Sequence, residues 1–238
     1  PVRRIPMNRI ALLALAGVLT LSACDSTEVE PVPIPAQTAD DIEADPATSF
    51  GPQGPVGNGL FTLFDLDTGQ VVLSSSETDA TARAADSTGT AWDIGFRATT
   101  IIFNNGISGP GSVRAQFLPT TPFAELTMAP ADGYLADGEN TCPAVQTPGG
   151  TFPGAPLVVC GGSDNGWYNY NPAANVVTPI PGNTIVFQTS EGDYGKLRVL
   201  SYYRGNPATP TENDTARYYT LEYVIQDDGT RDFQTTDN

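Results

Sequence analysis

The chain has 238 residues and a formal net charge of −16, with 27 acidic residues, 11 basic residues and no histidine. Such acidity argues against nucleic acid and anionic headgroups as partners, because binding them requires a basic surface. Without histidine the chain cannot build a Ser-His-Asp triad, a Cys-His dyad or a histidine-ligated metal site, and it lacks the commonest general base near neutral pH. We therefore expect a binding protein and not an enzyme.

The N-terminal residues predict an exported lipoprotein. We expect translation to start at Met7, followed by Arg9 and an apolar run over Ile10–Leu21. This run is shorter than the about 20 residues that span a bilayer, so residues 1–23 are predicted to be a signal peptide. Leu-Ser-Ala directly before Cys24 is the lipobox pattern, in which the cysteine is acylated and becomes the new N-terminus. We expect this lipid to be the sole anchor, at a bacterial outer membrane or cell surface. The alternative is an ordinary signal peptide followed by an incidental cysteine.

Two further regions follow the predicted signal peptide. Residues 24–57 are rich in Pro, Ala, Asp and Glu, which predicts an extended or disordered tether behind the lipidated cysteine. Residues 58–238 contain short apolar runs separated by Gly and Pro, which predicts one mainly β, antiparallel domain with few short helices. Residues 79–85 favour such a helix. The expected strands are 61–66, 70–74, 92–97, 99–103, 112–117, 157–160, 184–189, 195–203 and 218–226.

The stretch Asp65-Leu66-Asp67-Thr68-Gly69 separates the first two expected strands. Its alternate aspartates resemble the start of a calcium loop, but the closing carboxylate of that motif is missing. Asp-Thr-Gly also occurs in aspartic proteases, which need a second catalytic carboxylate, and the chain has no second Asp-Thr-Gly or Asp-Ser-Gly. We therefore interpret the stretch as a hairpin turn.

The chain has three cysteines, of which Cys24 is assigned to the lipid anchor. Cys142 and Cys160 then form an even pair in an exported protein, which predicts a disulfide. A metal site is the alternative, although further soft ligands are not found near the pair in sequence. The intervening loop is rich in Gly and Pro, and closing it should stabilise the fold by about 3 kcal/mol.

Three aromatic residues follow Cys160 in a turn-rich stretch, namely Trp167, Tyr168 and Tyr170. Aromatic side chains in loops can stack on a flat ligand or a sugar. Such binding requires at least two of the three rings to face solvent. The alternative is that Trp167 and one tyrosine cap the core.

Two pairs of motifs carry a family resemblance. In the first half these are residues 92–97, Trp-Asp-Ile-Gly-Phe-Arg, and 104–109, Asn-Asn-Gly-Ile-Ser-Gly. In the second half they are residues 195–205 and the strand pattern of 218–226. Together with the lipobox they resemble the HmuY family of haem-binding bacterial surface lipoproteins. The resemblance implies an all-β fold at the cell surface, haem capture for iron acquisition and delivery to an outer-membrane receptor.

The resemblance also implies two axial iron ligands, histidines or methionines, and here this chain departs from the family. After the signal peptide Met128 is the only methionine, so neither pair can form within one chain. Three possibilities remain: Met128 ligates the iron with Tyr168 or Tyr170 opposite, a porphyrin is held by apolar and aromatic contacts alone, or the fold binds a glycan or partner protein instead. A purely structural role for Met128 in packing is the alternative to the first.

Overall fold

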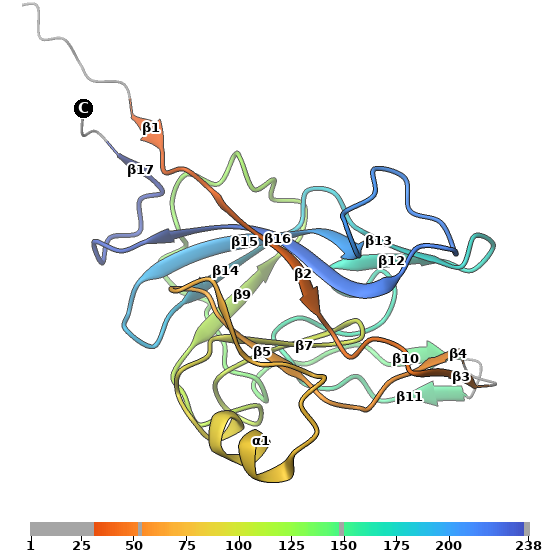
Figure 1. Ribbon diagram of the computed structural model, residues 1–238. Coiled ribbons are helices and arrows are strands. Elements are labelled where there is room, and N and C mark those ends of the chain that lie inside the picture. Colours follow the sequence, from red (N-terminus) through yellow and green to blue (C-terminus); the bar gives the residue numbers. More distant parts are fainter. Residues whose placement is uncertain (1–30, 52–53, 148–149, 236–238) are drawn as a thin grey trace, which may run out of the picture. The chain divides into compact units, whose positions relative to one another are not determined.

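The protein is an antiparallel β structure with two main sheets (Figure 1). The computed structural model describes residues 31–51, 54–147 and 150–235. The larger sheet has the order β2-β16-β15-β14-β9, with strands Gln37–Glu43, Ala216–Gln226, Tyr194–Tyr203, Thr184–Gln188 and Arg114–Leu118. The smaller has the order β6-β5-β7-β8, with strands Gln70–Leu73, Thr62–Asp65, Ile94–Arg97 and Thr100–Phe103. The predicted mainly β class is confirmed.

One apolar core joins the inner faces of the two sheets. Ile94 and Phe96 of β7 are buried in the same cluster as Leu197 of β15 and Leu221 of β16. Burying a side chain of this size stabilises a fold by about 1.5–3 kcal/mol. Trp92, which precedes β7, is also buried but lies in a separate, smaller cluster. Residues far apart in sequence thus fix the position of β7 against the larger sheet.

Among the described residues from 31 onward, the segment before β5 is folded, which corrects that part of the tether predicted over residues 24–57. β2 pairs with β16, with Ile42 opposite Tyr219, and both Ile42 and Ala44 are buried. The reason is tertiary: β16 offers an open backbone edge, and main-chain hydrogen bonds place few demands on side chains. The folded region therefore begins before residue 58. The predicted signal peptide and Cys24 lie outside the described residues.

Two short strand pairs flank β2 in this corrected segment. β1 pairs with β17, which brings the two ends of the described chain together. β3 pairs with β4 in a hairpin. These strands are Val32–Pro33, Gln234–Thr235, Ser49–Gly51 and Gly54–Val56.

The helix α1, Ala80–Ser87, confirms the helix predicted at 79–85. The Asp79 carboxylate accepts hydrogen bonds from the N–H groups of Thr81 and Ala82 at 3.0 and 2.9 Å, which caps the first turn. Arg83 donates to the Phe61 carbonyl and thereby ties the helix to the smaller sheet. Within the described ranges no helix has the length and apolar character to cross a membrane.

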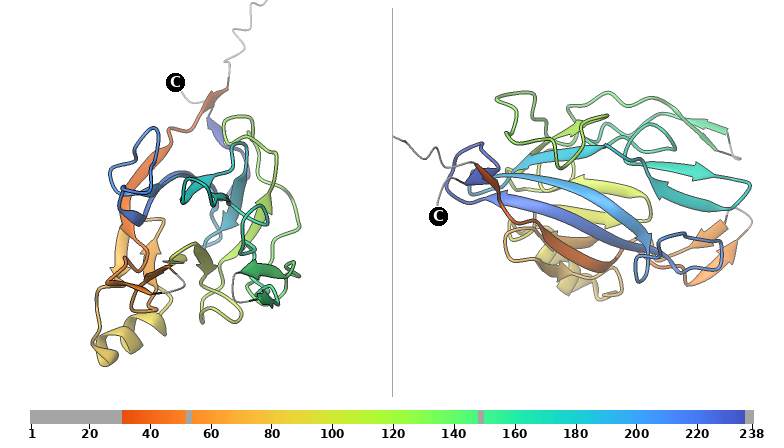
Figure 2. Two further views of the ribbon diagram at one scale, coloured as in Figure 1. Left: turned by 90° about the vertical axis from the view of Figure 1, so that its right-hand side faces the viewer. Right: turned by 90° about the horizontal axis from the view of Figure 1, so that it is seen from above.

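Two further hairpins follow β9. They are β10–β11, Val145–Thr147 and Gly150–Phe152, and β12–β13, Tyr168–Asn171 and Val176–Pro179. Figure 2 shows β10–β11 in green and β3–β4 in orange on the side of the structure that lies opposite to β1 and β17. The strand predicted over residues 157–160 is wrong, because the Val158 N–H bonds to the Asp137 side chain and not to a strand.

Candidate ligand-binding cleft

An apolar cleft lies between the β7–β8 turn and the segment closed by the disulfide. Its volume is about 910 Å³, at the upper end of the roughly 300–1,000 Å³ typical of ligand sites. Its polar side chains are those of Arg97, Thr100 and Ser108. The apolar side chains include Ile102, Ile107, Val145, Phe152, Leu157 and Val159. A largely apolar lining with a few polar groups is the usual composition of a small-molecule site.

The first wall of the cleft is the β7–β8 turn, residues 97–100. Arg97 and Thr100 are paired, and Ala98 between them has a φ of 46° in the left-handed region. Hydrogen bonds to two residues of the core hold Ala98 in place. The Ala98 N–H donates to the Ala44 carbonyl at 2.7 Å, and the Ala98 carbonyl accepts from the Tyr219 hydroxyl at 2.9 Å. The position of Arg97 is therefore set by the folded core.

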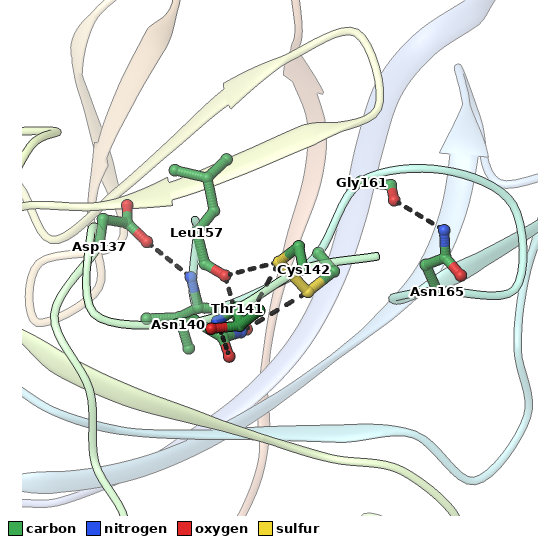
Figure 3. The surroundings of a disulfide bond; sticks show 9 residues. Asp137, Asn140, Thr141, Cys142, Leu157, Gly161 and Asn165 are labelled. Carbon is green, nitrogen blue, oxygen red and sulfur yellow. Dashed lines mark hydrogen bonds between the residues drawn. A yellow bond between two sulfur atoms is a disulfide. The ribbon is translucent and has the colours of Figure 1, made fainter. Parts of the chain in front are cut away.

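The second wall consists of Val145 and residues 152–161 and is closed by the Cys142–Cys160 disulfide, which confirms the predicted pair. The S–S distance is 2.00 Å and the Cα–Cα distance 5.4 Å. Beside the disulfide, the Asn140 amide donates to the carbonyls of Leu157 at 2.9 Å and Val158 at 3.2 Å (Figure 3). These contacts give an otherwise irregular segment a defined path.

Asp137 connects the second wall to strand β8. One carboxylate oxygen accepts from the Val158 N–H at 2.8 Å, and the other accepts from the Phe103 N–H at 2.8 Å. The side chain is buried, and burial raises the pKa of this carboxyl even though both backbone hydrogen bonds lower it. The Asp137 side chain thus holds the second wall in place beside strand β8.

Arg97 is the only charged residue lining the cleft. Its guanidinium lies 4.4 Å from the centre of the Phe61 ring and donates to the Gly59 carbonyl at 3.4 Å. No carboxylate pairs with it among the residues that the structure describes. In the sequence, Arg97 belongs to a strand motif and is not identified as a site residue. The signal that could have identified Arg97 was a single basic residue at the end of an otherwise apolar strand.

The predicted aromatic platform is not formed. Trp167 and Tyr168 are only 3% and 8% exposed, whereas Tyr170 is 40% exposed. Two of three rings needed to face solvent, so the interpretation of the cluster as a binding surface is wrong. The rings are drawn inward by packing, since Trp167 lies against both Tyr202 and Tyr219. Trp167 also donates to the Thr99 carbonyl at 2.9 Å and so supports the first wall from behind.

Met128 lies in the long connection after β9 and does not line the cleft. It is 52% exposed and forms an isolated bridge with Asp232. The neighbouring Ala129 is buried in a small cluster with Phe123 and Phe233. Met128 and Tyr168 thus belong to different surroundings, and the structure does not bring them together.

The cleft lacks the side chains that usually ligate haem iron. Protein ligands to haem iron are histidine, cysteine, methionine and tyrosine, and none of these lines the cleft. Its only side-chain oxygens are the neutral hydroxyls of Thr100 and Ser108. Apolar walls and a cation suit a porphyrin ring with carboxylates, but the lining does not suit axial coordination of iron.

A separate acidic cluster surrounds the β5–β6 turn, whose hairpin geometry confirms the prediction for residues 65–69. Carboxylate oxygens of Asp65, Asp67 and Asp93 lie within 4.8 Å of one another, a spacing that a cation could bridge. Asp65 already accepts from the N–H groups of Asp67 and Thr68, and Asp93 from that of Leu66. These bonds explain the cluster as the support of the turn.

Burial is the largest cause of unusual pKa values in this cluster. It raises the pKa of Asp93 to about 7, and repulsion from Asp67 and Asp65 adds to the effect. Burial together with repulsion from Glu191 raises the pKa of Asp67 to about 6. The Leu66 hydrogen bond opposes the shift of Asp93 without cancelling it.

The fold is mainly β, and the cleft combines apolar walls with one positively charged side chain. Among solved structures, the chain is similar to apo PinO from Porphyromonas gingivitis, with 14% identity and a TM-score of 0.43, over 81% of this chain and 97% of that one. It is also similar to the apo HmuY analogue of Tannerella forsythia, with 15% identity and a TM-score of 0.40, over 83% and 97% of the two chains.

A third similar structure is a protein from Bacteroides vulgatus described as HmuY-like and haem-binding, with 13% identity and a TM-score of 0.46, over 83% and 97% of the two chains. Two of these structures, those from Tannerella forsythia and Bacteroides vulgatus, carry the name of the family that the strand motifs resemble. At this identity, and with TM-scores below 0.5, we carry no function and no site over from these proteins. No protein-family model and no curated protein matches the chain.

Proposed function

We propose that this chain is a non-enzymatic capture protein for haem or a related porphyrin. It is held at the bacterial outer membrane or cell surface through a lipid on Cys24 and passes its ligand to an outer-membrane receptor. The observation that carries the proposal is an apolar cleft of about 910 Å³ in which Arg97 is the only charge. A porphyrin is a flat apolar ring with carboxylates, so these walls and this cation match its chemistry. The lipobox and the HmuY-like strand motifs support the location and the role.

A surface module that binds a partner protein is the second candidate. Ile107 and Phe152 line the cleft and are also exposed, and large exposed apolar side chains around a cleft are typical of interaction sites. The glycan alternative loses its support, because two of the three aromatic rings proposed for stacking are buried.

Haemin titration tests the proposal. The full chain would carry Cys24→Ser, which prevents acylation, and the shift of the Soret absorbance would report binding. Ala155 is exposed and lines the cleft, so Ala155→Trp should fill the cleft at little cost in stability and weaken binding tenfold or more. Ala174→Trp, an exposed substitution in the β12–β13 turn, is the matched control.

A saturable Soret shift that Ala155→Trp weakens and Ala174→Trp leaves unchanged supports porphyrin capture in this cleft. Absence of a saturable shift overturns the proposal and favours the partner-protein candidate. Equal binding by the parent chain and Ala155→Trp would show that the cleft is not the site.

A further inference from the structure

We propose that the cleft recognises a carboxylate of its ligand through Arg97 and does not coordinate iron, so that metal-free porphyrin binds as well as haem. This inference rests on the proposed function, because it specifies how that same cleft selects a porphyrin. It depends on the ligand-poor lining, the unpaired guanidinium and the rigid turn that presents it.

The first argument is that the candidate iron ligands Met128, Tyr168 and Tyr170 are engaged outside the lining of the cleft. Met128 is held beside Asp232 and Ala129, in a different cluster. The Tyr170 hydroxyl donates to Asn175 at 3.0 Å on the β12–β13 hairpin. Tyr168 is buried behind the first wall. None of them lines the cleft, so iron coordination would require part of the core to repack.

The second argument is that Arg97 has hydrogen-bonding capacity to spare. A guanidinium has five N–H donors, and Arg97 uses one of them in a long contact to a backbone carbonyl. Three of the other six arginines in the described ranges pair with carboxylates, whereas Arg97 does not. The three pairs are Arg114 with Glu139, Arg198 with Glu222 and Arg217 with Asp45. In a protein with a net charge of −16, an arginine left without an acidic partner inside an apolar cleft points to an anionic ligand.

The third argument is preorganisation. Arg97 precedes a turn in which the Ala98 N–H donates to the Ala44 carbonyl. The carbonyls of Ala98 and Thr99 in this turn accept from Tyr219 and Trp167. Its guanidinium also rests on the Phe61 ring, which limits the conformations of the side chain. Little conformational freedom is then lost when a carboxylate binds, and an arginine–carboxylate pair in an apolar site is a strong, charge-assisted contact.

The experiment compares three ligands with the full chain carrying Cys24→Ser. These are haemin, metal-free protoporphyrin IX and its dimethyl ester, which has the same ring without free carboxylates. We expect dissociation constants for haemin and protoporphyrin IX that agree within about threefold, because neither is bound through a metal. The dimethyl ester should bind about tenfold or more weakly, the loss expected for one charge-assisted hydrogen bond.

Two variants separate Arg97 from general electrostatics. Arg97→Gln should weaken protoporphyrin IX about tenfold or more and leave the dimethyl ester unchanged. Arg204→Gln is the matched control, because Arg204 also lacks a carboxylate partner among the described residues but lies over Tyr218, outside the cleft. Arg204→Gln should change neither affinity.

The outcomes distinguish this inference from the proposed function. Tight haemin binding with protoporphyrin IX a hundredfold weaker would overturn iron-independent recognition and leave haem capture standing. Equal effects of Arg97→Gln and Arg204→Gln would overturn the role of Arg97. Failure of both haemin and protoporphyrin IX to bind would overturn the proposed function itself.

Discussion

The two walls of the cleft are held by different means. The first wall is fixed by backbone and side-chain hydrogen bonds to Ala44, Trp167 and Tyr219, all of which are buried in the main core. The second wall is an irregular segment whose path depends on the Cys142–Cys160 disulfide and on the side chains of residues 137 and 140. Arg97, the residue proposed to bind the ligand carboxylate, thus lies on the wall that the core makes rigid. The shape of the cleft depends on the second wall, which the disulfide closes.

Breaking the second wall should have the largest effect. Cys142→Ser combined with Cys160→Ser should lower the free energy of unfolding by about 3 kcal/mol, because the unfolded chain is no longer constrained by the loop. Porphyrin affinity should fall as well, since six of the side chains that line the cleft lie between these two cysteines in the chain. Urea unfolding and Soret titration measure the two effects, with Cys24→Ser alone as the control. Unchanged affinity would show that the first wall is sufficient for binding.

An intermediate effect is expected at Asp93, which precedes β7 and belongs to the acidic cluster at the β5–β6 turn, outside the cleft lining. Its carboxyl pKa is raised from 3.8 to about 7, so the folded state binds more protons than the unfolded state between these values. The contribution of Asp93 to stability is therefore fully present below pH 3.8, is lost as the pH rises to about 7 and levels off above that value. Asp93→Asn, which keeps an acceptor for the Leu66 N–H, should remove about 1–3 kcal/mol of this decline between pH 5 and pH 8. Urea unfolding at both pH values measures it, and identical pH slopes for the two proteins would contradict the prediction.

The smallest effect is expected at Met128, which belongs to neither wall. Because the side chain is half exposed, Met128→Leu should change the free energy of unfolding by about 0.5 kcal/mol or less. It should also leave the haemin Soret band unchanged. Loss of the band in this variant would instead establish Met128 as an iron ligand and would overturn iron-independent recognition.

Much of the fold was predictable because short-range signals agree with it. The hairpin at residues 65–69, the helix near 79–85 and the long strand pair at 195–203 and 218–226 all follow local periodicity and turn chemistry. The Cys142–Cys160 bond followed from the number of cysteines in a chain predicted to be exported. The strand β2 could not be predicted, because its acidic sequence is poor in apolar residues and its stability comes from the edge of β16.

The candidate site was less predictable than the fold. The aromatic residues at 167, 168 and 170 were the visible chemical signal, yet two of them form part of the core. Arg97 gave a weak signal, since an arginine at the end of a strand is usually a solvated residue. Its role emerges only when residues of the second wall, some fifty positions later in the chain, close the other side of the cleft.

The sequence by itself determined the β class, the turn positions and the pairing of the two cysteines, because each depends on local residue patterns or on counting. It also excluded histidine chemistry outright. The tertiary structure alone decided that residues 37–43 complete the larger sheet, that Trp167 supports a turn and that Arg97 faces an apolar cleft. These outcomes depend on contacts between segments far apart in the chain. In such contacts, the burial of a side chain and the pairing of its charge depend on the neighbouring segments and not on the residue type alone.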